Sequence, residues 1–281
     1  MTNDLYAVVG DPIGHSKSPL IHRLFAEQTQ QALNYEAIRI DCEDEEFGYA
    51  IKTLKAKGYK GINITVPYKL DAFEQADILT ERAKVAHAVN TYLFDKDGKV
   101  TGDNTDGIGL VNDIEINGKT LFKDKTVLIL GAGGAVQGIM QPLLSKNPKN
   151  VHIANRSPKR AEVLAARFET DIISASDWQN VPIIKDGYDI IINGTSASLE
   201  NKLIPVTEKI IGKQSLVYDM MYGDKPTIFM DWAKKTNSNC QTMDGLGMLV
   251  GQAAEAFYLW RGVRPETTSV VAHIRNLIAS V

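Results

Sequence analysis

A glycine-rich turn stands between an apolar run and a helical pattern near the middle of the chain. The run 126–130 (TVLIL) has the composition of a buried strand, and Gly131-Ala132-Gly133-Gly134-Ala135 follows it at once. Closely spaced glycines let backbone N–H groups approach a pyrophosphate, whose charge is favoured at the N-terminus of the next helix. The strict G-x-G-x-x-G spacing fails, because Val136 holds the sixth position. The strand-turn-helix context therefore predicts a dinucleotide site, and a tight turn without a ligand is the alternative.

The residues after the next predicted strand, 151–154, favour NADP over NAD. An NAD site usually carries Asp or Glu about 20 residues after the turn, whereas a 2′-phosphate calls for arginine. Here Asn155, Arg156 and Ser157 follow the strand, Arg160 comes shortly after, and no carboxylate stands among them. Guanidinium and hydroxyl groups offer charge-assisted hydrogen bonds to a phosphate. The alternative is a solvated basic start of a helix.

Short apolar runs alternate with helical patterns along the chain, which is typical of an α/β protein with largely parallel sheets. A length of 281 residues favours two domains. The first part of the chain predicts strand, helix, strand, helix and strand at 5–10, 18–29, 36–40, 46–57 and 61–66.

A second α/β series begins with the strand 126–130 and a helix that runs to Leu144. Further strands are expected at 151–154, 189–193 and 216–219, with a helix at 158–168. A loop at 102–107 leads into a helix and marks the junction between the two series. After Asp244 the pattern is helical to the end, and these helices fit either domain.

Charge and apolar content exclude several classes of protein. With 44% hydrophobic and 23% charged residues the chain can fill ordinary cores. A formal net charge of −3 provides no basic face for nucleic acid, and no apolar run approaches the roughly 18 residues that cross a bilayer. The first residues lack the blocks of a signal peptide. We therefore expect a cytoplasmic protein that binds a small molecule, and neither nucleic acid nor a membrane.

The two cysteines, Cys42 and Cys240, are far apart and belong to no CxxC pair. Neither a disulfide framework nor a metal site is suggested by this spacing. We expect both cysteines to be structural.

Lys69 follows a strand whose polar residues share one face. In the strand 61–66 the period of two places Asn63 and Thr65 on the same side. Two hydrogen-bonding side chains and an ammonium would then meet at one end of the strand, as a catalytic or binding site requires. The pattern fits equally well a strand with a solvated face and an exposed lysine at a helix start.

Residues 14–20 (GHSKSPL) combine a helix start with two hydroxyl groups. Ser18 followed by Pro19 predicts an N-cap residue and the first helical residue. Ser16 and Ser18 near a helix N-terminus also form a neutral pocket suited to a carboxylate. Both roles can coexist.

Several motifs, in this order along the chain, resemble the shikimate dehydrogenase family, whose members reduce 3-dehydroshikimate to shikimate with NADPH. The motifs combine moderately specific segments into a specific series. They are 15–19 (HSKSP), 63–69 (NITVPYK), 88–91 (AVNT), 102–107 (GDNTDG), 131–135 (GAGGA), 155–157 (NRS), 193–196 (NGTS), 218–222 (YDMMY) and 244–252 (DGLGMLVGQ).

The resemblance implies roles for the matched residues, with Lys69 and Asp106 as the catalytic pair and NADP as the cofactor. It implies that shikimate is bound by polar side chains at Ser16, Ser18, Asn63, Thr65, Asn90, Asp106, Tyr222 and Gln252. Gly245 and Met248 would lie near the nicotinamide, and Thr195 would join the glycine turn and the 155–160 segment in binding the cofactor.

The resemblance also implies a two-domain arrangement. Residues 1–105 and 244–281 would form the substrate domain, because the terminal helices of the family pack back onto it. Residues 106–243 would form a Rossmann-type NADP-binding domain. For the oligomeric state, both a monomer and a homodimer are compatible with the sequence.

Three residues, at two places in the chain, depart from the family pattern. His87 stands where glycine is common before Ala-Val-Asn-Thr, and either a helix-end or a functional role is open for it. Val136 and Gln137 follow the glycine turn where Ser-Arg or Ala-Arg is usual, which predicts weaker contact with the cofactor phosphates.

Three alternatives remain at this stage. A quinate/shikimate dehydrogenase shares the substrate residues but tends to use NAD, with an acidic residue where Arg156 stands. The methylenetetrahydrofolate dehydrogenase group has a similar layout but matches the paired serines poorly. A non-catalytic NADP-binding regulator would be expected to lack Lys69 or Asp106, and both are present.

Overall fold

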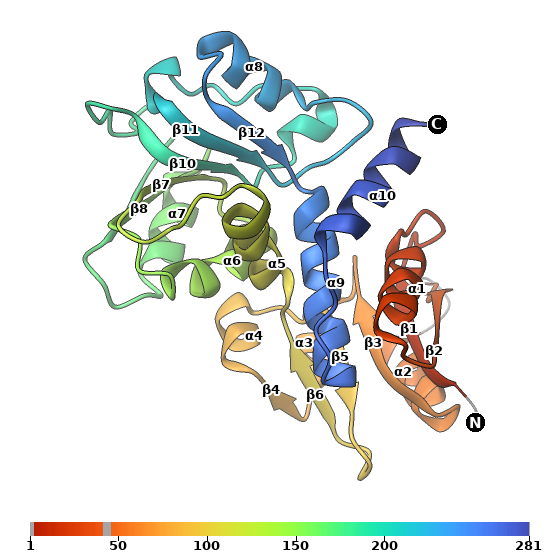
Figure 1. The fold of residues 1–281 in the computed structure, drawn as a ribbon. Coiled ribbons are helices and arrows are strands. Elements are labelled where there is room, and N and C mark those ends of the chain that lie inside the picture. Colours follow the sequence, from red (N-terminus) through yellow and green to blue (C-terminus); the bar gives the residue numbers. More distant parts are fainter. Residues whose placement is uncertain (1–2, 42–45, 281) are drawn as a thin grey trace.

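The computed structural model describes residues 3–41 and 46–280 and contains two lobes, each built around its own sheet (Figure 1). The first sheet has the order β2-β1-β3-β5-β6-β4. Its strands are β1 (Asp4–Gly10), β2 (Leu33–Arg39), β3 (Tyr59–Ile64), β4 (Ile78–Leu79), β5 (Thr91–Phe94) and β6 (Val100–Asp103). The helices of this lobe are α1 (Ser18–Thr29), α2 (Phe47–Ala56), α3 (Lys69–Gln75) and α4 (Glu81–Ala86).

The first sheet is mixed, so the prediction of a largely parallel sheet needs correction here. Strands β1, β2 and β3 are parallel, but β5 runs antiparallel to both β3 and β6. The turn between β5 and β6 is short, with the Asp95 amide donating to the Lys99 carbonyl. A connection this short can join only antiparallel strands.

The second sheet is parallel throughout, with the order β12-β11-β10-β7-β8-β9. Its strands are β7 (Thr126–Leu130), β8 (Asn150–Ala154), β9 (Ile173–Ser176), β10 (Tyr188–Asn193), β11 (Ile211–Asp219) and β12 (Gln241–Asp244). The helices are α5 (Asp106–Asn112) with the π-helical η1 (Asp113–Asn117), α6 (Gly134–Leu144), α7 (Pro158–Ala165) and α8 (Ile228–Thr236), with 3-10 turns η2 (Ala197–Glu200) and η3 (Glu208–Ile210).

Strand β7 shows why the sequences of the central strands in this sheet are unbroken apolar runs. Val127 and Ile129 join one buried cluster, whereas Leu128 and Leu130 join another on the opposite face. A parallel strand covered on both faces needs apolar residues at every position. The expected Rossmann-type unit is therefore confirmed.

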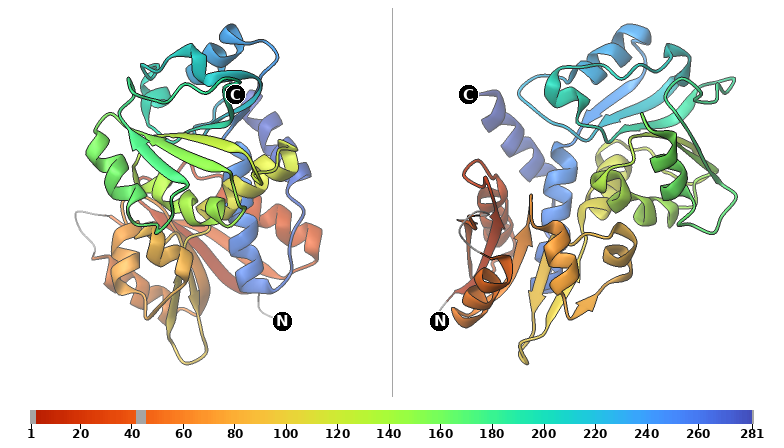
Figure 2. Two further views of the ribbon diagram at one scale, coloured as in Figure 1. Left: turned by 90° about the vertical axis from the view of Figure 1, so that its left-hand side faces the viewer. Right: turned by 180° about the vertical axis from the view of Figure 1, so that it is seen from behind.

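The terminal helices α9 (Leu246–Arg261) and α10 (Thr268–Ala279) return to the first lobe, as predicted (Figure 2). They form one buried cluster with α1, in which Phe25 meets Phe257 at a ring distance of 5.8 Å. The Trp260 indole N–H donates to the Tyr92 carbonyl at 2.9 Å. A Cβ atom at Gly61 would overlap the Trp260 ring, so only glycine lets α9 approach β3 this closely.

Several predicted bounds shift in the structure. Strand β2 begins at Leu33 rather than residue 36, and β3 covers Tyr59–Ile64 rather than 61–66. Helix α7 ends at Ala165, before the expected residue 168, and the helical region expected after Asp244 consists of α9 and α10. The short strands were not predicted, because two to four residues carry too little periodicity. They are β4, β5, β6, β9 and β12. Helices α3, α4 and α8 were also missed.

Cys240 is fully buried and its thiol is free, which fits the structural role expected for it, while Cys42 lies outside the described residues. No helix within residues 3–41 and 46–280 is long and apolar enough to cross a membrane.

Candidate active site

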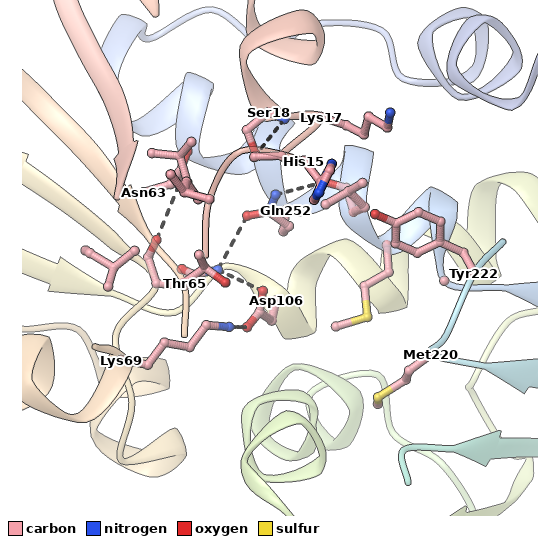
Figure 3. Close-up of a pocket in the computed structure, with 18 of the residues that line it drawn as sticks. His15, Lys17, Ser18, Asn63, Thr65, Lys69, Asp106, Met220, Tyr222 and Gln252 are labelled. Atoms are coloured by element: carbon pink, nitrogen blue, oxygen red, sulfur yellow. Dashed lines mark hydrogen bonds and ion pairs between the residues drawn. The ribbon is translucent and has the colours of Figure 1, made fainter. Parts of the chain in front are cut away.

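A cavity of about 380 Å³ lies between the two lobes (Figure 3). Every residue expected to act in catalysis or substrate binding lines it, together with two of the expected cofactor residues. They are Ser16, Ser18, Asn63, Thr65, Lys69, Asn90, Asp106, Tyr222, Gly245, Met248 and Gln252. Residues from β1 through α9 thus converge on one cavity.

Lys69 and Asp106 form an ion pair inside this cavity. Each begins a helix, α3 for the lysine and α5 for the aspartate, and Lys69 Nζ lies 2.7 Å from Asp106 Oδ2. Their side chains are only 32% and 16% exposed, so water screens the pair less than on an open surface. The ammonium keeps its remaining N–H bonds for a group in the cavity.

Asn90 holds the other oxygen of the aspartate. Its side-chain amide donates to Asp106 Oδ1 at 2.8 Å and to Thr105 Oγ1 at 3.0 Å, and its Oδ1 accepts from the Thr105 amide at 2.9 Å. The side-chain nitrogen of Asn90, Nδ2, also lies 3.5 Å from Gln252 Oε1. Asn90 is 3% exposed, so packing and hydrogen bonds together fix the carboxylate.

Asn63 is held in a similar way from the back of the cavity. The Tyr35 hydroxyl donates to its Oδ1 at 2.7 Å, and its Nδ2 donates to Thr91 Oγ1 at 3.0 Å. Burial raises the pKa of Tyr35 well above its usual range, so the phenol stays a neutral donor. The His22 ring stacks on Tyr35 at 4.1 Å.

The serines at the start of α1 differ in role from the sequence prediction. The helix begins at Ser18, its N-cap residue is Lys17, and no side chain caps it, so the prediction of Ser18 as the N-cap is wrong. The Ser18 amide instead donates to Ser16 Oγ at 3.3 Å. With the helix start shifted by one residue, the Ser18 side chain lies on the first turn and lines the cavity.

The second lobe contributes Met220 and Tyr222, which follow β11, to the wall of the cavity (Figure 3). Gly245 and Met248, at the start of α9, line the cavity as well. A Cβ atom at Gly245 would overlap the Met220 carbonyl oxygen, so glycine is required where β12 passes into α9. Sequence reasoning missed the lining residues His15, Lys17 and Met220, although each lies within a quoted motif.

The glycine turn has an open, donor-rich geometry. Gly131 adopts φ +114, a conformation that favours glycine, and helix α6 begins at Gly134. A Cβ atom at Gly131 would stand 3.2 Å from Thr195 Cγ2, which places Thr195 beside the turn as expected. Gly133, Gly134 and the Ala135 side chain are exposed. The first amides of α6 have no partner within the helix, as an anion site needs.

The basic segment after β8 lies close to this turn. Asn155 Nδ2 donates to the Ser157 carbonyl at 2.9 Å, and Arg156, Ser157 and Arg160 are exposed. Arg160 and Gly133 line a common groove of about 320 Å³. Backbone donors and guanidinium groups around one groove fit a dinucleotide with an additional phosphate.

His87 occupies a helix end. It is the C-cap residue of α4 with φ +48, a conformation that glycine adopts readily, and its ring lies 5.1 Å from that of Phe73. Its backbone explains why glycine is common there. Among the described residues no cluster of His, Cys, Asp and Glu could hold a metal ion.

Comparison with known proteins identifies the family. Residues 8–92 match the shikimate dehydrogenase substrate binding domain, 115–234 match shikimate / quinate 5-dehydrogenase, and 245–275 match the shikimate 5′-dehydrogenase C-terminal domain. The chain is 68% identical, over 98% of its length and 99% of the relative, to a shikimate dehydrogenase (NADP(+)) from Hydrogenovibrio crunogenus. The chain belongs to the shikimate dehydrogenase family.

Solved structures of similar proteins agree with this assignment. An Ael1 enzyme from Pseudomonas putida superposes with a TM-score of 0.91 at 42% identity, covering 96% of this chain and 98% of that one. A shikimate 5-dehydrogenase from Thermus thermophilus, solved with NADP(H) and shikimate, has a TM-score of 0.82 at 29% identity, with 97% and 99% covered. The family, the two-domain fold and the oxidoreductase class predicted from the motifs are confirmed.

Proposed function

We propose that this chain catalyses the reversible NADPH-dependent reduction of 3-dehydroshikimate to shikimate, with Lys69 and Asp106 as its catalytic pair. The observation that carries the proposal is the 2.7 Å contact between Lys69 Nζ and Asp106 Oδ2 in a cavity that both lobes line. The names of the relatives support the reaction and the cofactor.

The cavity supplies distinct groups for the two ends of a cyclic hydroxy acid. The hydroxyls of Ser16 and Ser18, next to the N-terminus of α1, suit the carboxylate. The hydroxyls of the ring would be bound by polar side chains that line the same cavity: Asn63, Thr65, Asn90, Tyr222 and Gln252. Hydrogen bonds of this kind reject analogues that lack a hydroxyl.

The bound nicotinamide supplies hydride chemistry, and the protein must stabilise the charge that grows on the substrate oxygen. The Lys69 ammonium, placed at that oxygen, stabilises the charge and donates a proton. Asp106 orients the ammonium through Oδ2, while Asn90 fixes Asp106 through Oδ1. In the reverse direction Lys69 accepts the proton from the hydroxyl.

For the cofactor, we assign the pyrophosphate to the turn 131–135 and the 2′-phosphate to the segment Asn155, Arg156, Ser157 and Arg160. Thr195 would contact the cofactor from the end of β10. Gly245 and Met248 would lie beside the nicotinamide, because both line the substrate cavity at the start of α9, where the chain leaves the second sheet.

We infer that residues 1–105 and 244–281 act as the substrate domain and residues 106–243 as the NADP domain. The separate sheets support this division, with Asp244 as the last residue of the second sheet. A monomer and a homodimer are both compatible with this cavity. We place the activity in the cytoplasm, where NADPH is available, and cell fractionation tests this.

A spectrophotometric assay of the reduced nicotinamide, crossing shikimate and quinate with NADP and NAD, tests the proposal. The highest rate is expected with shikimate and NADP. The alternative, a quinate/shikimate dehydrogenase using NAD(P), predicts substantial turnover of quinate or with NAD. Binding of NADP without turnover of either substrate would contradict an enzymatic function.

A further inference from the structure

The arginines of this chain fall into two groups. Every arginine outside residues 156–167 forms an ion pair with a carboxylate: Arg23, Arg39, Arg82, Arg261, Arg264 and Arg275. Arg156, Arg160 and Arg167 form none with any residue that the structure describes. An arginine cluster without carboxylate partners has its positive charge available for a ligand.

Arg167 belongs to this cluster although it lies past the end of α7. It lines the same groove of about 320 Å³ as Gly133 and Arg160. Arg167 Nη1 donates to Gln137 Oε1 at 3.0 Å. Gln137 lies in the first turn of α6, where its backbone N–H donates to the Gly133 carbonyl. A neutral amide thus holds the guanidinium beside the glycine turn without neutralising its charge.

The neighbouring charges leave this arrangement positive. Lys159 also lines the groove, but its Nζ lies 3.8 Å from Glu162 Oε2. Glu200 forms an ion pair with Lys202 at 2.6 Å, and this pair, together with the charge of Arg156, lowers the pKa of the Glu200 carboxylate. Arg160 and Arg167 therefore line the groove without an ion pair to any described carboxylate.

We propose that Arg167 binds the 2′-phosphate of NADP, acting with Arg160 across the groove while Gln137 holds its guanidinium in place. The inference rests on the proposed function, because it takes NADP as the cofactor. Gln137, which the sequence suggested would weaken phosphate contact, instead positions a cation that comes from the end of α7. A planar guanidinium can bind two phosphate oxygens at once, which gives a dianionic phosphate a specific partner.

Isothermal titration calorimetry with NADP+ and NAD+ measures binding without turnover and so tests the assignment of Arg167. Arg167→Ala is expected to raise the NADP+ dissociation constant by about tenfold or more, as loss of a charged hydrogen bond does, and to change NAD+ binding by less than about twofold. Gln137→Ala should raise the NADP+ constant less, because the guanidinium stays but is no longer held. Arg167→Lys should recover part of the affinity.

Lys235→Ala serves as the charge-matched control, because Lys235 is an exposed residue of α8 outside the groove. It should leave both dissociation constants unchanged, and circular dichroism should show native folding for each variant. Unchanged NADP+ binding by Arg167→Ala, or an equal loss for NADP+ and NAD+, overturns the inference. If Arg160→Ala selectively weakens NADP+ binding in the same series, the proposed cofactor still stands. If the unmodified protein shows no preference for NADP+, the proposed function itself fails.

Discussion

Lys69 Nζ lies 2.7 Å from Asp106 Oδ2, although 37 positions separate the two residues and each begins a different helix. Asn90 holds the second oxygen of the same carboxylate. The carboxylate of Asp106 is therefore held at both of its oxygens, which provides the preorganisation that catalysis by a charged group requires.

Lys69→Ala removes the proton donor from the cavity. We expect kcat to fall by about 10²–10⁴-fold, as for general acid–base groups, with little change in the KM for shikimate. Steady-state kinetics measure both constants, and Lys52→Ala, an exposed lysine of α2, provides a control that should behave as the unmodified enzyme. A large rise in KM at normal kcat would show that Lys69 only binds.

Asp106→Asn keeps the shape of the side chain but removes its charge. The amide oxygen of the new side chain can still accept a hydrogen bond from Asn90 Nδ2, so the fold should persist. The ammonium of Lys69, however, loses its counter-ion. Because the ammonium that donates the proton is no longer held by its counter-ion, we expect kcat to fall with a smaller change in the KM for shikimate, and steady-state kinetics measure both constants. A kcat equal to that of the unmodified enzyme would argue that Asp106 does not orient Lys69.

Tyr35→Phe removes the hydroxyl that donates to Asn63 Oδ1. We expect the KM for shikimate to rise several-fold, since a neutral hydrogen bond contributes about 1 kcal/mol, while kcat and NADP+ affinity change little. Substrate kinetics and a separate NADP+ titration distinguish this from general damage. Equal losses in all of these quantities would indicate a purely structural role.

Arg156→Asp places a carboxylate where the 2′-phosphate is expected. Repulsion should penalise NADP far more than NAD, so the ratio of their kcat/KM values should fall by at least about tenfold. The same assay run with Arg23→Ala, on α1, should leave the ratio unchanged. An equal loss with both cofactors would remove Arg156 from 2′-phosphate recognition.

His22 couples folding stability to pH. Burial lowers the pKa of His22 to about 3, while the nearby Asn63 side chain opposes this, and neither ring nitrogen has a hydrogen-bond partner among the described residues. Below its ordinary pKa of about 6.5 the unfolded state binds a proton that the folded state excludes, so stability falls as pH drops toward about 3.

Denaturant unfolding across this range, compared with His22→Phe, measures the effect. The slope for one proton is at most about 1.4 kcal/mol per pH unit, and the variant should lack that contribution. Phenylalanine retains the stacking on Tyr35 and removes the unpartnered nitrogens, so stability near neutral pH should not fall greatly. Parallel pH curves for the two proteins would contradict the assignment.

Local patterns were sufficient for the start of the second lobe. The glycine turn and the apolar run of β7 predicted a strand, a tight turn and a helix, because each depends on neighbouring residues and on burial of the strand on both faces. The family motifs likewise indicated each expected site residue. They did not predict the antiparallel β5, whose four residues have no decisive period and whose direction follows from its turn to β6.

The sequence by itself determined the alternation of elements, the glycine turn, the basic segment that favours NADP and the family. Only the tertiary structure decided that Lys69, Asn90 and Asp106 meet, and that Arg167 reaches Gln137 beside the glycine turn. The physical reason is that periodicity and turn chemistry act between near neighbours, whereas these contacts depend on how whole helices pack. The return of α9 to β3 and β5 completes the cavity, and packing across more than 150 residues of chain leaves no local signal.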